Sequence, residues 1–282
     1  MLAKGRRFDR RKAGRLALLW ILNAFFLFFF LFPFYWQTVT ALKPSAELYA
    51  QPVMWLPSHL DWTHFQTVFT LFHFQQNIRN SVIVATATTI VSLVVGTLAA
   101  YALARLPLPA KRTILVLVVT MVTFPGIALV ASMFIVLRGL HLIDTYPALI
   151  IPYVAFSLPF AIWVLTNFFR DIPADLAEQA EVDGCTPFQS LRRVILPLAA
   201  PGLVTAGLLI FIGAWNEFLF AYTFTSNNVT IPVAIFGFGG IHEIPWGEIS
   251  AGSEMVTLPI IALVLIFQRR IVQGLTAGAL KG

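Results

Sequence analysis

The sequence has very few charged residues. Asp, Glu, Lys and Arg make up 11% of its 282 residues, whereas 58% of the residues are hydrophobic and the mean hydropathy is +0.81. A soluble domain carries about 25% charged residues, so this chain lacks the polar side chains to cover a water-facing surface. Its apolar runs approach or exceed the ~20 residues that a bilayer requires. These features exclude an ordinary soluble domain and predict an all-α, polytopic membrane protein.

Cysteine and the residue groups of catalysis are also scarce. Cys185 is the single cysteine, so an internal disulfide cannot form. The phosphate-binding pattern Gly-x4-Gly-Lys-Ser/Thr is absent, which places any ATP hydrolysis on another chain. No acid pair, nucleophile–base set or group of His, Cys and carboxylates at metal-ligand spacing stands out. We therefore expect no enzyme, no metal site and no cofactor bound by this chain.

The positive charge gathers at the start of the chain. Seven of the 19 basic residues lie within residues 1–15, directly before the first apolar run. Basic residues in this position orient a membrane span, so the net charge of +6 does not indicate nucleic acid. A cleaved signal peptide is the alternative. However, the run 16–39 is longer than a signal core and no small-residue cleavage site follows it, so we expect a retained first span.

Hydropathy predicts six transmembrane helices, at residues 16–40, 79–104, 113–137, 146–169, 200–224 and 254–268. The last is short, so we expect it to begin within the preceding loop. If residues 1–15 are cytoplasmic, 16 basic residues lie inside and three lie outside, namely Lys43, Arg79 and Arg138. This bias predicts that both termini are cytoplasmic. The predicted parts are a basic N-terminus (1–15), a transmembrane domain (16–268) that includes a cytoplasmic loop (171–198), and a cytoplasmic tail (269–282).

The cytoplasmic loop 171–198 carries helical signals of its own. Helix-favouring residues up to Ala180 precede Asp183-Gly184, where glycine accepts the left-handed conformation that ends a helix. Thr186-Pro187 then begins a second helix with a cap and a first-turn proline. Four apolar residues follow at three- and four-residue spacing, which are Phe188, Leu191, Val194 and Ile195. The pattern fits a docking surface for another protein, and it also fits an amphipathic helix on the membrane surface.

This loop resembles the EAA motif of ATP-binding-cassette (ABC) importer permeases. That motif reads Glu-Ala-Ala, three residues, Gly, nine residues, Ile, one residue and Leu-Pro. The matching residues here are Glu178-Gln179-Ala180, Gly184, Val194 and Leu196-Pro197, and Gln179 and Val194 are conservative departures. Similar segments lie at 101–105, 168–173, 215–218 and 268–282. The chain is thus similar to the second permease subunit of carbohydrate importers of the maltose/trehalose type, a binding-protein-dependent inner-membrane component.

The resemblance implies a set of contacts and partners. The residues expected to couple to an ATPase are Glu178, Gln179, Ala180, Asp183, Gly184, Phe188, Leu196 and Pro197. The C-terminal tail is a second expected contact, through Gly274, Thr276 and Gly278. The implied partners are a second permease that completes a heterodimer, two ATPase subunits that hold ATP and Mg, and an extracytoplasmic solute-binding protein. The implied location is the bacterial inner membrane.

Glu217 is the one acid that the predicted topology places inside a span. An intramembrane carboxylate is a functional candidate, and the neighbouring Asn216 can pair with it. A rise of ~1.5 Å per residue from about position 200 puts Glu217 near the outer face. We expect Asn216 and Glu217 to have a role in the pathway or its gating, or a structural role.

The expected function is ATP-driven import of a neutral di- or oligosaccharide. An anionic ligand, such as glycerol 3-phosphate or a glycerophosphodiester, would require basic residues at the outer mouth, and only Lys43, Arg79 and Arg138 are available there. Import of another sugar is a further alternative. A gradient-driven sugar transporter would need coupling-ion groups at the midplane and internal repeats, which are not evident.

Overall fold

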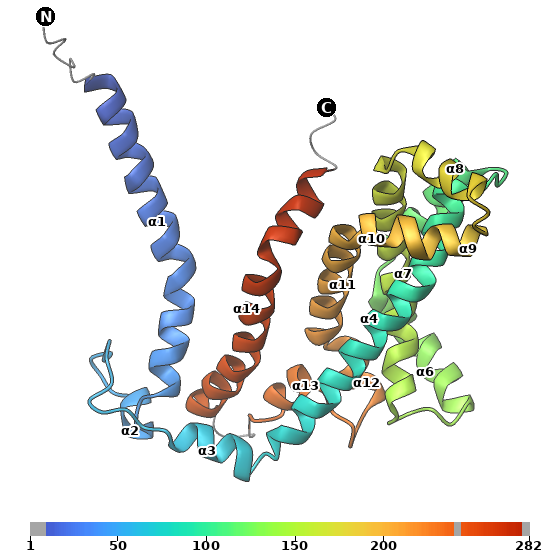
Figure 1. Cartoon of the computed structure of the whole chain (residues 1–282). Coiled ribbons are helices and arrows are strands. Elements are labelled where there is room, and N and C mark those ends of the chain that lie inside the picture. Colours follow the sequence, from blue (N-terminus) through green and yellow to red (C-terminus); the bar gives the residue numbers. More distant parts are fainter. Residues whose placement is uncertain (1–9, 240–243, 278–282) are drawn as a thin grey trace, which may run out of the picture.

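The computed structural model describes residues 10–239 and 244–277, and every regular element within them is a helix. Four of these helices are long and apolar enough to cross a membrane: α1 (Arg10–Ala41), α4 (Phe74–Arg105), α7 (Tyr146–Asp171) and α14 (Trp246–Ala277). Each extends between the two ends of the molecule (Figure 1). The last begins before residue 254, within the preceding loop, as predicted.

Two further predicted spans are interrupted. The third, 113–137, consists of α5 (Lys111–Val122), η1 (Gly126–Leu129) and α6 (Val130–Gly139), with an 88° bend where Pro125 cannot donate the next helical hydrogen bond. The fifth, 200–224, consists of α11 (Ala200–Trp215), a break at 216–218, and α12 (Leu219–Phe224). A second bend, of 80°, separates α11 from the helical segment before it. Among the described residues, four helices could span a membrane alone, and up to six spans result if each bent pair (111–122 with 126–139, and 187–198 with 200–215) counts as one crossing.

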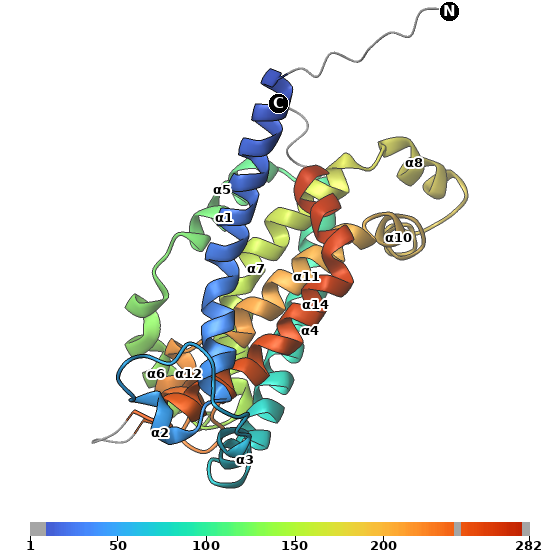
Figure 2. The same ribbon diagram turned by 90° about the vertical axis from the view of Figure 1, so that its left-hand side faces the viewer.

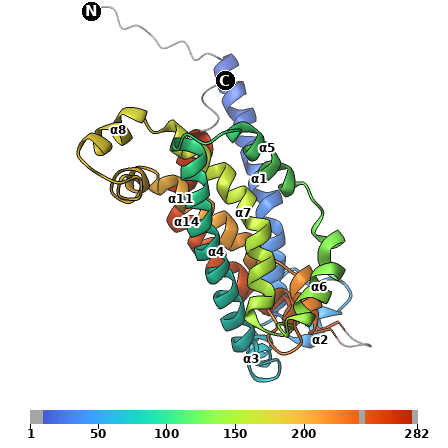
Figure 3. The ribbon, with the colours of Figure 1, turned by 90° about the vertical axis from the view of Figure 1, so that its right-hand side faces the viewer.

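The remaining helices lie at the two ends of the molecule (Figures 1 and 3). One end, here called the loop end, holds α8 (Ala174–Val182), α9 (Pro187–Ser190), η2 (Leu191–Ile195) and α10 (Leu196–Leu198). The opposite end holds α2 (Ser45–Leu48), α3 (Thr63–Thr70) and α13 (Ile231–Phe236). Helix α1 begins and α14 finishes at the loop end, so the chain enters and leaves the bundle on the same side.

Small residues bring α4, α7 and α11 close together. A Cβ placed on Gly96 of α4 would lie 2.9 Å from Cβ of Ala161 on α7. A Cβ on Gly207 of α11 would lie 2.9 Å from a methyl group of Leu93 on α4. Such spacing lets backbones approach and is typical of helix contacts in membranes. These three helices form the central unit of the fold.

Helix α1 runs along the length of the molecule (Figure 2), but it diverges from α14 toward the loop end and stands apart from the central unit (Figure 1). The two helices contact each other near the opposite end. The apolar window of the α1 span is 0% buried. Its main polar contact links Thr38 to Glu254 of α14, at 2.8 Å. Glu217 is therefore not the single acid inside a candidate span, because the span Trp246–Arg270 contains both Glu248 and Glu254. The predicted sixth span, 254–268, itself begins at Glu254, so the prediction of a single intramembrane acid was wrong.

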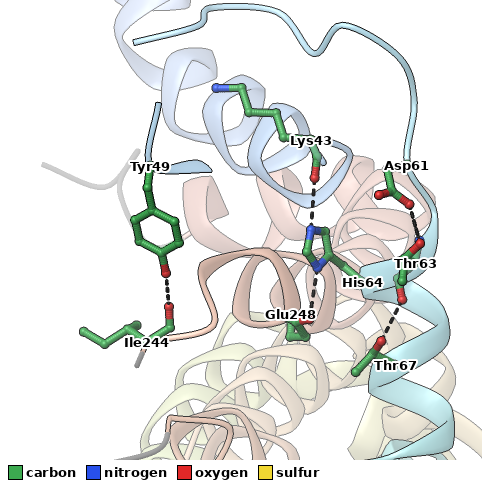
Figure 4. Close-up of polar contacts among 8 residues, drawn as sticks. All are labelled: Lys43, Tyr49, Asp61, Thr63, His64, Thr67, Ile244 and Glu248. Carbon is green, nitrogen blue, oxygen red and sulfur yellow. Dashed lines mark hydrogen bonds and ion pairs between the residues drawn. The ribbon is translucent and has the colours of Figure 1, made fainter. Parts of the chain in front are cut away.

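A buried polar cluster ties the far end of α1 to α3 and α14 (Figure 4). His64 is 2% exposed, and its ring nitrogens lie 3.0 Å from a Glu248 carboxylate oxygen and 3.0 Å from the Lys43 carbonyl oxygen. The neighbouring Gly247 must lack a side chain, since a Cβ there would lie 2.3 Å from the His64 ring. The Tyr49 hydroxyl donates to the Ile244 carbonyl at 2.7 Å. This cluster fixes the opposite end of the α1–α14 pair.

Candidate functional site

The loop 171–198 projects sideways from the bundle as two short helices joined by a tight turn (Figure 3). Gly184 forms the turn with φ of +82°, a left-handed conformation that side chains disfavour. The Cys185 N–H donates to the Ala180 carbonyl at 2.9 Å, the six-to-one bond of a Schellman helix end. The turn between α8 and α9 therefore requires glycine at position 184.

The second short helix is capped on both sides of its first turn. The Thr186 hydroxyl accepts from the Gln189 N–H at 3.3 Å, and the Gln189 side chain accepts from the Thr186 N–H at 2.9 Å. This capping box satisfies two otherwise free donors, and Pro187 fits the first helical position. Local sequence signals thus define both the end of α8 and the start of α9.

A π-helical segment, η2, follows directly. The Leu196 N–H donates to the Leu191 carbonyl five residues back, which inserts one extra residue into the helical turn. In a regular α-helix the Pro197 ring would clash with the carbonyl four residues before it, and the wider π turn relieves this clash. The predicted apolar face is only partly buried. Leu191 and Ile195 are buried, whereas Phe188 is 62% exposed.

The buried side chains of the loop anchor it to the central unit. Leu191 and Ile195 belong to an apolar cluster with Tyr101 of α4 and Phe169 of α7, whose rings meet edge to face at 6.5 Å. Fully burying each aliphatic side chain stabilises the contact by about 1.5–3 kcal/mol. The second half of the loop is therefore packed onto the bundle, and α8 is the part that projects.

The predicted coupling residues divide into exposed and packed groups. The exposed residues are Glu178, Gln179, Asp183, Gly184, Phe188 and Pro197, whereas Ala180 is buried and Leu196 is half-buried. A surface cavity of about 490 Å³ lies beside them, lined by Phe188, Gln189, Arg192 and Arg193. Arg192 and Arg193 are not among the predicted coupling residues. In the tail, Gly274 and Thr276 lie in α14 without a described side-chain environment, and Gly278 lies outside the described residues.

At the break of the fifth span, Glu217 acts as a cap for α12. Its carboxylate accepts from the Phe220 N–H at 2.9 Å, from the Ala221 N–H at 3.2 Å and from the Tyr153 hydroxyl of α7. Carboxylates at helix N-termini satisfy free backbone donors in this way. Asn216 is exposed and instead donates to the Ile212 carbonyl at 2.9 Å. Glu217 thus joins the break to α7 and does not pair with Asn216.

The interruptions of the third and fifth spans meet beside α7. A Cβ on Gly126, just after the first break, would lie 3.5 Å from the ring of Phe220. The Phe220 ring in turn lies 5.3 Å from that of Phe156 on α7. Next to them, Phe218, Tyr222 and Phe236 form a mutual ring cluster, with Tyr222 54% exposed. Two broken helices therefore converge on one aromatic region.

Asp144 holds the segment after α12 at the opposite end of the molecule. One carboxylate oxygen accepts from the backbone N–H groups of Ser226, Asn227 and Asn228, at 2.8, 2.8 and 3.0 Å. Partial burial opposes the charged form of Asp144, but these N–H donors and the Asn227 side chain outweigh it. Together they lower the pKa of Asp144 from 3.8 to about 2.

Replacing Asp144 with asparagine is expected to remove a pH-dependent part of the stability. The pKa of Asp144 is lowered in the folded protein, so its contribution is present above the ordinary pKa of 3.8 and is lost as the pH falls toward about 2. Thermal unfolding in detergent should show the variant less stable than wild type at neutral pH, with the difference shrinking below pH 3.8. A constant difference across this range would contradict the assignment.

Taken together, these features define a class. Long apolar helices, interrupted spans that meet beside α7 and a projecting two-helix loop describe a multi-pass membrane protein. The chain belongs to the family of binding-protein-dependent transport system inner membrane components, whose profile matches residues 92–276.

Individual relatives match nearly the full length. The chain is 43% identical to the trehalose transport system permease protein of Mycobacterium tuberculosis (strain CDC 1551 / Oshkosh), covering 95% of this chain and 99% of the relative. It is 42% identical to the sulfoquinovosyl glycerol transport system permease protein of Agrobacterium fabrum (strain C58 / ATCC 33970), covering 89% of each. It is 40% identical to the trehalose/maltose transport system permease protein of Thermococcus litoralis (strain ATCC 51850 / DSM 5473 / JCM 8560 / NS-C), covering 89% and 92%.

A solved structure shares the fold. It is a crystal structure of a bacterial ABC transporter involved in the import of the acidic polysaccharide alginate, with a TM-score of 0.78. The match covers 95% of this chain and 99% of that chain at 23% sequence identity. The helical arrangement is thus shared with a chain of a bacterial ABC transporter.

Proposed function

We propose that this chain is a permease subunit of an ATP-driven ABC importer for a neutral di- or oligosaccharide of the trehalose or maltose type. The projecting loop with its exposed helix α8 carries the proposal, because a transport component that lacks a phosphate-binding loop needs a surface on which an ATPase can act. Glu178, Asp183 and Gly184 on that surface couple the chain to one of two ATPase subunits. ATP and Mg belong to those subunits.

The charge distribution supports the orientation. Sixteen basic residues belong to the segments at the loop end or to the termini, and three belong to the other side. The positive-inside rule then makes the loop end cytoplasmic, and it places both termini on the cytoplasmic side of the bacterial inner membrane. In this orientation α8 faces the compartment that supplies ATP. The opposite end faces an extracytoplasmic solute-binding protein.

The uncovered helix α1 supports a second permease as partner. Its span is 0% buried, and a groove of about 620 Å³ runs beside it, lined by Ala24, Leu27, Phe28, Leu31, Phe32, Tyr35 and Trp55. Lipid covers part of this face. A heterodimeric partner covers the rest and closes the pathway along the interrupted spans.

The substrate class rests on the relatives and on the placement of one lysine. Two relatives are named for trehalose, one of them also for maltose. Lys43, one of three basic residues expected at the outer mouth, is 3% exposed, with its ammonium group over the Trp36 ring and bonded to the Met54 carbonyl. The Lys43 ammonium group is therefore not available to bind an anionic ligand, and this supports a neutral sugar as substrate. Glycerol 3-phosphate, a glycerophosphodiester or another sugar conjugate remains the alternative.

Uptake by the reconstituted complex tests this function. Proteoliposomes with the partner permease, the ATPase subunits and the binding protein should accumulate labelled trehalose or maltose when ATP is supplied on the loop side. Unlabelled disaccharide should compete, and glycerol 3-phosphate should not. Uptake that follows an ion gradient without ATP would replace the proposal with gradient-driven transport.

Glu217→Gln is expected to lower uptake, and Glu217→Ala to lower it further. The amide keeps one accepting oxygen but turns an NH₂ group toward the donors of Phe220, Ala221 and Tyr153. Each donor left unsatisfied costs about 1–3 kcal/mol, so the break between α11 and α12 loosens. Tyr153→Phe is the matched variant, and its effect should not add to that of Glu217→Gln. Unchanged uptake in the glutamine variant would remove Glu217 from the pathway and its gating.

A further inference from the structure

Arg105, the last residue of α4, contacts the C-terminal end of α7, where the projecting loop begins. One guanidinium nitrogen, Nη2, donates to the Phe169 carbonyl at 2.6 Å and also to the Ile172 carbonyl. The last carbonyls of a helix have no partner within the helix, and a cation there also favours the helix dipole. The charged donor therefore satisfies carbonyls on both sides of Asp171, where α7 ends.

The residues around Arg105 restrict the link between α7 and α8. Ile172 has an extended backbone, with φ of −73° and ψ of 130°, so α7 and α8 are joined by a short non-helical link that could rotate. The same apolar cluster that anchors η2 packs around this link and includes Ala104, Leu106 and Ile172. The Nε atom of Arg105 is buried and has no partner among the described residues. The Nη2 atom of the guanidinium is thus committed to the two carbonyls.

We propose that Arg105 is a positioning residue for coupling. It binds the C-terminal end of α7 to the C-terminal end of α4, so that a movement of α8 displaces both helices together. The inference rests on the proposed function, since it concerns how a push on α8 reaches the spans. A push on α8 alone would be absorbed by rotation at Ile172. With Arg105 in place, the push passes to α4 and α7 as one unit, and these helices already meet closely at Gly96 and Ala161.

Three variants test the proposal in the reconstituted complex. Arg105→Met removes the donor, Arg105→Lys keeps a cation with a shorter reach, and Arg170→Met removes an exposed arginine from the neighbouring end of α7. The readouts are ATP hydrolysis and trehalose uptake, expressed as sugar moved per ATP. This ratio reports coupling, whereas a loss of folding lowers both quantities together.

The methionine variant should retain ATP hydrolysis but lose at least about tenfold in sugar moved per ATP, the factor that corresponds to ~1.4 kcal/mol. The lysine variant should fall between it and wild type, and Arg170→Met should stay within about twofold of wild type, as surface substitutions do. A wild-type ratio in Arg105→Met overturns the assignment. A methionine variant that does not assemble, combined with a wild-type ratio in Arg105→Lys, assigns Arg105 to folding and also overturns it.

The same experiment separates this inference from the proposed function. A wild-type complex that hydrolyses ATP but takes up no sugar of the panel counts against the proposed substrate. A wild-type complex that transports, alongside an Arg105→Met complex that transports equally well, counts against the role of Arg105 alone.

Discussion

Transport is expected to be abolished when Gly184 is replaced by proline, while the protein still inserts in the membrane. Gly184 has φ of +82°, and the proline ring fixes φ near −65°. The turn between α8 and α9 therefore cannot form, and the exposed surface of α8 is no longer presented to an ATPase. The buried anchor at Leu191 and Ile195 lies beyond the turn and stays intact. Uptake and membrane yield, measured on the same preparation, check both parts.

A graded pair of variants separates conformation from size. A Cβ on Gly184 meets nothing within 4 Å, so Gly184→Ala adds only backbone strain of about 1–2 kcal/mol. Gly139 at the end of α6 also has open space around it but no left-handed φ, which makes Gly139→Ala the matched control. We expect partial uptake for Gly184→Ala and normal uptake for Gly139→Ala. Normal uptake by an expressed Gly184→Pro variant would contradict the coupling assignment.

Replacing Gly202 with alanine is expected to destabilise the central unit strongly. A Cβ at this position in α11 would lie 2.4–2.7 Å from the inner ring atoms of Phe168 on α7. Overpacking of this kind costs about 1–3 kcal/mol, and the ring cannot move away without leaving its place beside α11. The thermal midpoint of the purified complex should fall, and the folded yield should fall with it.

A compensating change identifies the cause. Adding Phe168→Ala to Gly202→Ala removes the ring that the new methyl group meets, so the double variant should be more stable than the sum of the single effects allows. Gly213→Ala in the same helix is the control, because a Cβ there meets nothing within 4 Å. Additive effects, or an equal loss in Gly213→Ala, would show that α11 does not pack on α7 in this way.

Local sequence signals were sufficient for much of the loop. The glycine at 184 and the Thr186-Pro187 pair act within one helical turn, so their consequences follow from backbone conformation and capping alone. The start of α14 before residue 254 was also expected, because the predicted span was too short to cross a bilayer. These features depend on neighbours in the chain and on the thickness of the membrane.

The rest depends on contacts between distant segments. A hydropathy window averages over Pro125 and over residues 216–218, so it merged helices that the structure interrupts. The Glu217 bond to Tyr153 and the His64 contacts with Glu248 and Lys43 join residues far apart in sequence. The hydrogen bond from Arg105 to the Phe169 carbonyl of α7 likewise joins residues far apart in sequence. A single sequence offers the residue types but not their pairing.

ATP hydrolysis by the purified complex in lipid, with its binding protein and a panel of ligands, tests the central claim most directly. The account predicts that ATPase subunits co-purify with this chain, that trehalose or maltose stimulates hydrolysis, and that Gly184→Pro removes the stimulation. Stimulation by glycerol 3-phosphate alone would contradict the substrate class. Failure of any ATPase subunit to co-purify, under conditions that preserve membrane complexes, would contradict the coupling of this chain to ATP.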